Sequence, residues 1–259
     1  MDDQPLDFSQ PKYDLLLSPP VMNAAGTLGF APQSSDLVDF DRLGAFITNP
    51  VSLHPRTPAR ARTSQPYPGG FLLHSGYPNP GLRAVIKRYA TRWARSALPV
   101  IVHLLVHQME DVQQMVAELE GREGLMGIEL GLPPDSEPSQ AIELVQAGVG
   151  ELPLIVRAPI ERAGEFARLL VGSPLAAISL SPPRGMVLDQ HDQPVRGRLF
   201  GPAVFPLGLA AVQELIDIGV PVIASGGVHQ QSQVEALLAM GAIGVQLDAV
   251  LWSLGVQVG

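Results

Sequence analysis

A chain of 259 residues with 46% apolar and 16% charged residues is long and apolar enough for a globular core of barrel size. Its formal net charge of −8 argues against nucleic acid or an anionic membrane surface as a partner. The lack of cysteine excludes disulfides, thiolate metal sites and a cysteine nucleophile or base. The sequence shows neither a signal-peptide pattern nor an apolar run of about eighteen residues, so we expect a cytoplasmic protein without a membrane span.

Short apolar runs alternate with helical patterns along most of the chain. The runs that can form parallel strands are 21–24, 45–49, 100–104, 127–130, 154–157, 176–180, 220–225 and 243–247. The helical patterns are 81–95, 109–120, 137–147, 161–170, 207–218 and 230–240, with a shorter candidate at 36–43. This alternation predicts an α/β fold, a closed (β/α)8 TIM barrel in one domain over residues 1–259. An open doubly wound sheet is the structural alternative, although such sheets seldom have eight units this regular.

The two ends of the chain depart from a regular barrel. Within the N-terminal segment 1–19, residues 6–17 are expected to form a small hairpin at the barrel bottom. Residues 249–259 are too short and too glycine-broken for a full closing helix, so a reduced final helix is predicted. We expect this to expose apolar surface, which favours a homodimer or a heterologous partner subunit, unless the N-terminal segment covers the gap. The residues of that surface are Val250, Leu251, Trp252 and Leu254.

Two connections, 54–79 and 182–202, are too long to be plain loops and carry several arginines. Both follow strands, so we expect ordered lids over the mouth formed by the carboxyl ends of the strands. Arg56 and its neighbours Arg60 and Arg62 could clamp the carboxylate or phosphate of a small anionic ligand. A solvated basic loop is an equally good interpretation.

Glycines follow the seventh and precede the eighth strand run. Gly226 and Gly227 would let backbone amides approach a ligand, and loops after strands seven and eight of such barrels often bind phosphate. Asp248 begins the second of these loops, where its carboxylate would repel a phosphate about 4 Å away by roughly 1 kcal/mol in water and more when shielded. The alternatives are ordinary turns for the glycines and a capping role for Asp248.

Two polar residues interrupt apolar strand runs in the middle of the chain. His103 has no further ligands at metal-binding spacing, so no metal site is predicted and a hydrogen-bonded structural histidine is favoured. Glu129 alternates with apolar neighbours and could act as an acid or base if it points into the barrel. Packing of Glu129 against Arg157 is the simpler interpretation.

Several motifs occur in an order that resembles the dihydroorotate dehydrogenase family. They are PVMNAAGT at 20–27, ITNPVSLHPR at 47–56, SGYPNPG at 75–81, IELGLP at 128–133, VRGRLFGP at 195–202, SGG at 225–227 and GA at 241–242. The resemblance runs from about residue 20 to residue 252. It implies an FMN-containing barrel of pyrimidine biosynthesis that moves a hydride from dihydroorotate to the flavin.

The resemblance also assigns roles to residues. The candidate cofactor-binding residues are Ala24, Ala25, Gly26, Asn49, Arg157, Gly197, Gly201, Gly226 and Gly227, and the candidate substrate-anion residues are Arg56 and Asn79. Asn49 and Arg157 stand where the family has lysines near the flavin, and Leu73 matches an asparagine that would hold orotate. Pro133 and Pro134 occupy the serine and cysteine positions of the family's base motif, so no hydroxyl or thiol there can take the substrate proton. The catalytic residue is therefore unknown.

Three functions stay open from the sequence. The first is an FMN-dependent oxidoreductase of the dihydroorotate dehydrogenase type, with ordinary dihydroorotate oxidation absent or weak and FMN binding weakened by Asp248. The second is a non-catalytic relative that acts as an assembly or regulatory subunit. The third is a flavin-free barrel enzyme for an anionic metabolite.

Overall fold

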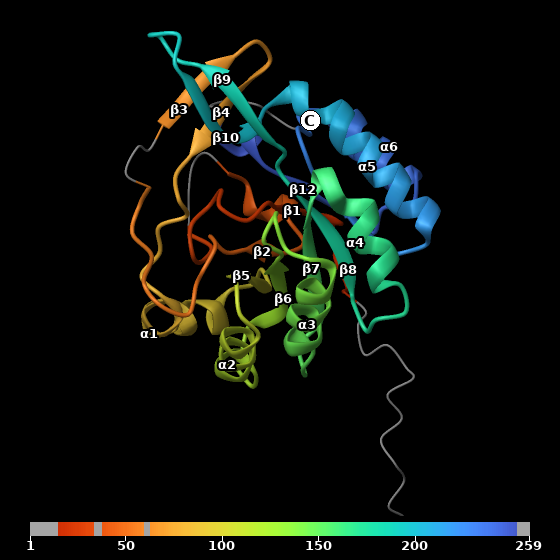
Figure 1. The fold of residues 1–259 in the computed structure, drawn as a ribbon. Coiled ribbons are helices and arrows are strands. Elements are labelled where there is room, and N and C mark those ends of the chain that lie inside the picture. The colour runs from red at the N-terminus through yellow and green to blue at the C-terminus, as the bar shows by residue number, and fades with distance from the viewer. Residues whose placement is uncertain (1–14, 34–37, 60–62, 253–259) are drawn as a thin grey trace, which may run out of the picture.

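The computed structural model describes residues 15–33, 38–59 and 63–252. Eight parallel strands form one sheet in the order β1-β12-β11-β8-β7-β6-β5-β2 (Figure 1). The strands are β1 (Val21–Asn23), β2 (Phe46–Ile47), β5 (Val100–Leu105), β6 (Leu125–Gly131), β7 (Leu154–Pro159), β8 (Ala177–Ser181), β11 (Val222–Ala224) and β12 (Gly244–Leu247). A parallel bridge between Met22 and Ala45 joins the two ends of this order, so the sheet closes on itself. The predicted (β/α)8 barrel is confirmed.

Helices connect the strands and cover the outside of the barrel (Figure 1). They are α1 (Leu82–Arg95), α2 (Met109–Leu119), α3 (Pro138–Gly148), α4 (Ala163–Leu170), α5 (Phe205–Ile218) and α6 (Gln231–Ala239). The connection after β1 contains only the short 3-10 helix η1 (Phe40–Arg42), and residues 34–37 of the helix expected at 36–43 lie outside the described residues. Within the described part of the chain, β12 is followed by the 3-10 helix η4 (Ala249–Trp252), which confirms the reduced final helix.

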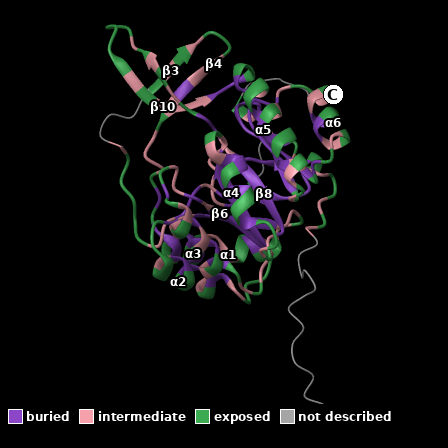
Figure 2. Ribbon diagram, turned by 45° about the vertical axis from the view of Figure 1, so that its right-hand side comes forward, coloured by how far each residue is buried: buried purple, intermediate pink, exposed green. Residues whose placement is uncertain are grey.

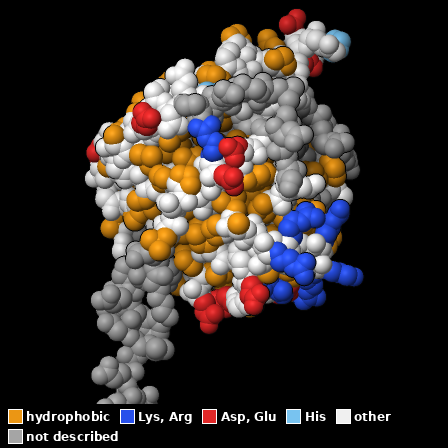
Figure 3. Space-filling model, turned by 180° about the vertical axis from the view of Figure 1, so that it is seen from behind, with side chains coloured by type: hydrophobic (Ala, Val, Ile, Leu, Met, Phe, Trp, Pro, Cys, Tyr) orange, Lys and Arg blue, Asp and Glu red, His pale blue; other side chains and the backbone are white. Residues whose placement is uncertain are grey.

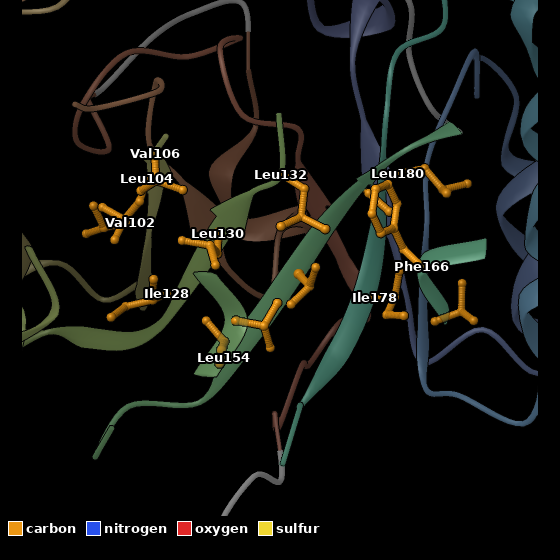
Figure 4. Close-up of a cluster of buried hydrophobic side chains, with 14 of the residues drawn as sticks. Val102, Leu104, Val106, Ile128, Leu130, Leu132, Leu154, Phe166, Ile178 and Leu180 are labelled. Atoms are coloured by element: carbon orange, nitrogen blue, oxygen red, sulfur yellow. The ribbon is translucent and has the colours of Figure 1, made fainter. Parts of the chain in front are cut away.

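The main hydrophobic core lies between the barrel and its helices. Strand residues alternate, so that every second side chain points outward, as Val102, Leu104, Ile128 and Leu130 do (Figure 4). Phe166 of α4 is fully buried in the same cluster. Figure 2 shows the barrel strands as mostly buried, while the helices keep an exposed outer face. This layer anchors the strand ends that carry the functional side chains.

A second, smaller apolar cluster fills the lower part of the barrel interior. Its buried members come from six of the eight strands and the residue before β2, and they are Met22, Ala45, Ile47, Ile101, Ile155, Ala177 and Ile223. Leu15 and Leu17 pack against this cluster. The described end of the N-terminal segment therefore lies at the barrel bottom, whereas most of the hairpin expected at 6–17 lies outside the described residues.

The two long connections do not form separate loop lids. They pair with each other as a four-stranded antiparallel sheet in the order β3-β4-β10-β9, which projects beyond one end of the barrel (Figure 1). The strands are β3 (Thr63–Tyr67), β4 (Gly70–His74), β9 (Arg184–Leu188) and β10 (Pro194–Phe200). Sequence reasoning missed this sheet because each hairpin pairs with a segment more than a hundred residues away.

The apolar residues after β12 are less exposed than the sequence suggested. Val250 is 4% exposed, so the expectation that it would be surface-exposed is wrong, and Leu254 lies outside the described residues. Trp252 is 39% exposed, packs against Phe71 and Phe200, and donates from Nε1 to the carbonyl of Thr27. Among the described residues, no helix has the length and apolar character needed to cross a lipid bilayer.

Candidate active site at the barrel mouth

A cavity of about 180 Å³ opens between the carboxyl ends of the strands and the antiparallel sheet. It is smaller than the range of about 300–1,000 Å³ that is usual for drug-sized ligands. It is lined by Ala25, Pro50, Arg56, Tyr77, His103, Leu105, Val106, His107, Gly131, Leu132, Pro133, Pro134, Arg157, Ser181 and Arg198. A second cavity, of about 190 Å³, shares three of these residues, namely Arg56, Tyr77 and Arg198.

The mouth cavity gathers positive charge. Arg157 comes from β7 and is 5% exposed, while Arg56 and Arg198 come from the two long connections. Arg56 donates from Nε to the carbonyl of Gly76 at 2.7 Å. Arg198 donates from one terminal nitrogen to Ser181 Oγ at 3.2 Å and to the carbonyl of Pro182 at 2.9 Å. Among the described residues, no acidic side chain lines the cavity, so it favours an anion.

A layer of polar side chains lies directly beneath the cavity, inside the barrel. Glu129 of β6 is fully buried and accepts hydrogen bonds from Ser179 Oγ at 2.7 Å and from Gln246 Nε2 at 2.6 Å. Its Oε2 lies 2.6 Å from His103 Nδ1 and 3.5 Å from a terminal nitrogen of Arg157. The contacts agree with the simpler interpretation of each residue, since His103 is hydrogen-bonded and Glu129 packs against Arg157.

The polar layer shifts the pKa values of its titratable groups. Burial alone would raise the pKa of Glu129, but Arg157 together with hydrogen bonds from His103 and Ser179 outweighs burial and lowers it to about 2. Burial lowers the pKa of the His103 imidazole, and the hydrogen bond to Glu129 offsets this only in part. At neutral pH the layer therefore contains a carboxylate, a guanidinium and a neutral imidazole.

The glycine turn after β11 is occupied by a side chain of the protein itself. Asp248 is 2% exposed and accepts hydrogen bonds from the backbone amides of Gly227, at 3.4 Å, and Ala249, at 2.5 Å. Burial raises the pKa of Asp248, although these two amide bonds and nearby positive groups oppose the shift. A carboxylate thus takes up amides that a phosphate would need at this turn.

Backbone atoms also pack closely against the glycines of this region, which leaves no space for a side chain at Gly201 or Gly227. A side chain at Gly227 would bring its Cβ within 2.5 Å of the Phe205 nitrogen and 2.6 Å of the Gly201 carbonyl oxygen. Gly226 has φ +109° and approaches Gly208. Gly201 has φ +112° and packs against Gly69 and Gly70.

The candidate residues after β1 and β2 divide between the cavity and the framework. Ala25 lines the cavity, whereas the amide of Ala24 donates to the carbonyl of Leu247 at 2.7 Å and links β1 to β12. Gly26 has φ +93° in the turn that follows. Asn49 is not among the lining residues of the cavity, and its Oδ1 accepts from the amide of Gly29 at 3.0 Å.

The remaining candidates lie in the antiparallel sheet or beside it. Gly197 lines the second cavity, and its backbone approaches Leu72 and Leu73 closely. Asn79 is 6% exposed, and its Oδ1 accepts from the amides of Ser52 and Gly81 at 3.2 and 3.0 Å. These bonds order the connection that carries Arg56, and Asn79 does not line the mouth cavity.

Sequence reasoning missed Tyr77, Ser179 and Gln246 as part of this site. The last two carry a usable signal, because each is a polar residue at an inward position of a largely apolar strand, as His103 and Glu129 are. Tyr77 has no such signal, since only the fold of a long connection brings it to the cavity.

The site residues do not fit FMN well. The mouth cavity does not extend to Gly226 and Gly227, and Asp248 already accepts the Gly227 amide that would face a phosphate. Asn49 bonds to Gly29 of the connection after β1 and offers no positive charge to a flavin ring.

A closed parallel barrel with its polar cavity at the carboxyl ends of the strands defines a (β/α)8 protein with a ligand site at the usual rim. A family model described as dihydroorotate dehydrogenase matches residues 12–135. A relative from Geotalea uraniireducens, named dihydroorotate dehydrogenase B (NAD(+)), catalytic subunit, is 30% identical over 93% of this chain and 86% of its own length. The chain belongs to the dihydroorotate dehydrogenase family.

Other comparisons agree with this assignment. A relative of the same name from Geotalea daltonii is 29% identical over the same shares of both chains. The crystal structure of DHODH from Eimeria tenella in complex with ferulenol superposes with a TM-score of 0.68 at 14% identity, over 90% of this chain and 76% of that chain. At this identity the match shows the fold alone, and it confirms the barrel.

Proposed function

We propose that this member of the dihydroorotate dehydrogenase family binds FMN poorly and oxidises dihydroorotate weakly or not at all. The observation that carries the proposal is the contact between the Asp248 carboxylate and the amides of Gly227 and Ala249. A phosphate at this turn would have to displace a buried acidic side chain or lie beside it. Two negative charges about 4 Å apart repel by roughly 1 kcal/mol in water and several-fold more when shielded.

The cavity wall supports the same proposal from the side of the chemistry. Pro133 and Pro134 line the cavity, and the resemblance matches them to the hydroxyl and thiol positions of the family's base motif. A proline carries no group that can accept a proton, and loss of a general base lowers a rate by about 10²–10⁴-fold. The cavity keeps a strongly positive lining, so its ligand on this proposal is a small anionic metabolite.

The visible absorption spectrum of purified protein tests the cofactor part of the proposal. We expect little or no flavin and weak or undetectable turnover of dihydroorotate after added FMN, with a catalytic subunit of a Geotalea relative as the positive control. A protein purified with near-stoichiometric flavin, or one that turns over dihydroorotate at the rate of that control, would refute the proposal.

Assembly is a second part of the proposed function. The relatives are named catalytic subunits, which supports association of this cytoplasmic chain with another subunit or with a second copy of itself. Figure 3 shows apolar side chains gathered over the middle of the face opposite to the view of Figure 1. Light scattering after size exclusion measures the oligomeric state directly, and a monomer at micromolar concentration would rule out the homodimer.

A further inference from the structure

A buried imidazole and carboxylate form a dyad under the mouth cavity. His103 of β5 and Glu129 of β6 are directly opposite each other in the parallel register. Nδ1 of His103 lies 2.6 Å from Oε2 of Glu129, and the two residues are 3% and 0% exposed. A carboxylate at this distance holds the proton on Nδ1, which leaves the lone pair of a neutral imidazole on Nε2.

The Nε2 atom of His103 faces the cavity. Both His103 and Gly131 line the cavity, and an ideal Cβ at Gly131 would lie 2.9 Å from Nε2. Gly131 therefore makes the room that the imidazole occupies, and a side chain at this position would displace the ring. Within the described ranges, Nε2 has no hydrogen-bond partner, so it is available to a molecule in the cavity.

The arginines of the cavity indicate the chemical class of that molecule. Arg157 supports the dyad from one side, while Arg56 and Arg198 are each anchored through a single nitrogen and lack a carboxylate partner among the described residues. Guanidinium groups with free nitrogens bind carboxylates well. A cavity of about 180 Å³ that does not reach Gly226 and Gly227 suits a short carboxylic acid without a phosphate.

We propose that His103 is the general base of a flavin-independent proton transfer on a small 2-oxo acid bound in this cavity, with Glu129 as its positioning residue. The carbon–hydrogen bond next to the carbonyl breaks, and its proton forms a bond to Nε2. The electron pair stays with the substrate as an enolate whose oxygen faces the arginines. The proton on Nε2 exchanges with solvent, and a proton from Nε2 then returns to the carbon, so the exchange needs no oxidant. The inference rests on the proposed function in one respect, since the cavity must be free of a flavin ring.

The ionisation of the dyad agrees with this role. Burial is the main cause that lowers the pKa of His103, so the imidazole is neutral and able to accept a proton at neutral pH. The charged groups that face it are Glu129 on β6, Arg157 on β7 and Arg198 on β10. The negative charge of Glu129 raises the proton affinity of His103, and the two arginines lower it.

Deuterium exchange measured by proton NMR tests the inference. Protein first shown to be free of flavin is incubated with pyruvate or 2-oxobutyrate in D₂O, and loss of the C3 proton signal is followed. We expect exchange above the buffer rate, and a loss of about 10²–10⁴-fold in His103→Gln. His191→Gln, at an exposed turn between β9 and β10, is the matched control and should keep the wild-type rate.

The positioning role of Glu129 has its own readout. In Glu129→Gln the proton affinity of His103 should fall, so the acid limb of the pH–rate profile should move to lower pH. A purely structural role would lower the rate at all pH values without moving that limb. Either an unchanged limb or the absence of exchange with both acids in folded wild-type protein would overturn the inference.

A measurement on the wild type guards against variants that do not fold. Nitrogen NMR of ¹⁵N-labelled imidazoles should show His103 with its proton on Nδ1, and the Nε2 resonance should shift when 2-oxobutyrate is added. A proton on Nε2, or an Nε2 resonance that does not shift when the ligand is added, would contradict the inference. Flavin found in the purified protein would instead defeat the proposed function, and the dyad would then be tested after the flavin is removed.

Discussion

Two carboxylates are buried in the described part of this barrel, and their surroundings shift their pKa values in opposite directions. Glu129 and Asp248 are 0% and 2% exposed. Burial raises the pKa of both, but Arg157, His103 and Ser179 outweigh it at Glu129 and bring that pKa to about 2. Asp248 has two backbone amides as its hydrogen-bond donors, and its pKa remains raised.

Burial imposes a desolvation penalty on a charged group, and the hydrogen bonds and opposite charges around that group determine whether the penalty is offset. Glu129 is bonded to side chains from four other strands, so it fixes the interior of the barrel mouth. Asp248 holds a single turn, and its negative charge opposes any anion there. One carboxylate therefore supports the site, and the other restricts what the site can bind.

The largest effect is expected from removing the carboxylate of Glu129, which has more hydrogen-bond partners than that of Asp248. Glu129→Ala leaves Arg157 as a buried charge without its partner, which should lower the free energy of unfolding by about 3–5 kcal/mol. Urea denaturation followed by circular dichroism measures the loss. In the Arg157→Met background the same substitution should cost much less, and a similar loss in both backgrounds would show that the ion pair is not the cause.

The barrel could be predicted from the sequence because it depends on local patterns. Strand runs such as 100–104 and 154–157 are apolar on the side facing the helices, and helical periods separate them. The antiparallel sheet could not be predicted in the same way. Its pairing of Leu73 with Arg198 joins distant segments whose sequences carry no pairing signal.

The site was predictable in parts for the same physical reason. Arg157 and Ala25 lie at strand ends, where topology alone brings them to the rim, and both line the cavity. Asn79 and Asn49 were plausible on sequence position, but hydrogen bonds to nearby loop backbone determine where their side chains point, within its own connection for Asn79 and to the connection after β1 for Asn49. Such bonds depend on the loop conformation, which apolar periodicity does not encode.

Removing the less satisfied carboxylate should sharpen the contrast in ligand binding. Asp248→Gly eliminates the repulsion and releases the amide of Gly227, so the affinity for FMN should rise about tenfold or more, equivalent to about 1.4 kcal/mol. Quenching of flavin fluorescence gives the dissociation constant. Asp192→Gly is the control, because Asp192 has φ +55° at an exposed turn and tolerates glycine. Equal affinities in wild type and Asp248→Gly would argue against the role given to Asp248.

The pH dependence of stability should differ in sign between the two carboxylates. The lowered pKa of Glu129 gives stability that is present above about pH 4.5 and lost as the pH falls toward about 2. The raised pKa of Asp248 does the reverse, because its ionisation destabilises the folded state as the pH rises above 3.8. Asp248→Asn should therefore gain stability relative to wild type as the pH increases, by less than the loss expected for Glu129→Ala. The urea midpoints of wild type and Asp248→Asn are compared from pH 4 to pH 8. A difference that stays constant over this range would show that burial does not disfavour the ionised form of Asp248.

The smallest effect is expected at an exposed ion pair, although its two groups lie closer together than the 3.5 Å that separates Glu129 from Arg157. Arg184 and Asp135 approach to 2.9 Å, but their side chains are 46% and 83% exposed. Water and salt screen such a pair, so Asp135→Ala should change the free energy of unfolding by less than about 1 kcal/mol, and less again at high salt. Urea denaturation at low and high ionic strength measures both. A loss as large as that of Glu129→Ala would mean that charge separation, rather than desolvation and partner number, governs the ion pairs of this barrel.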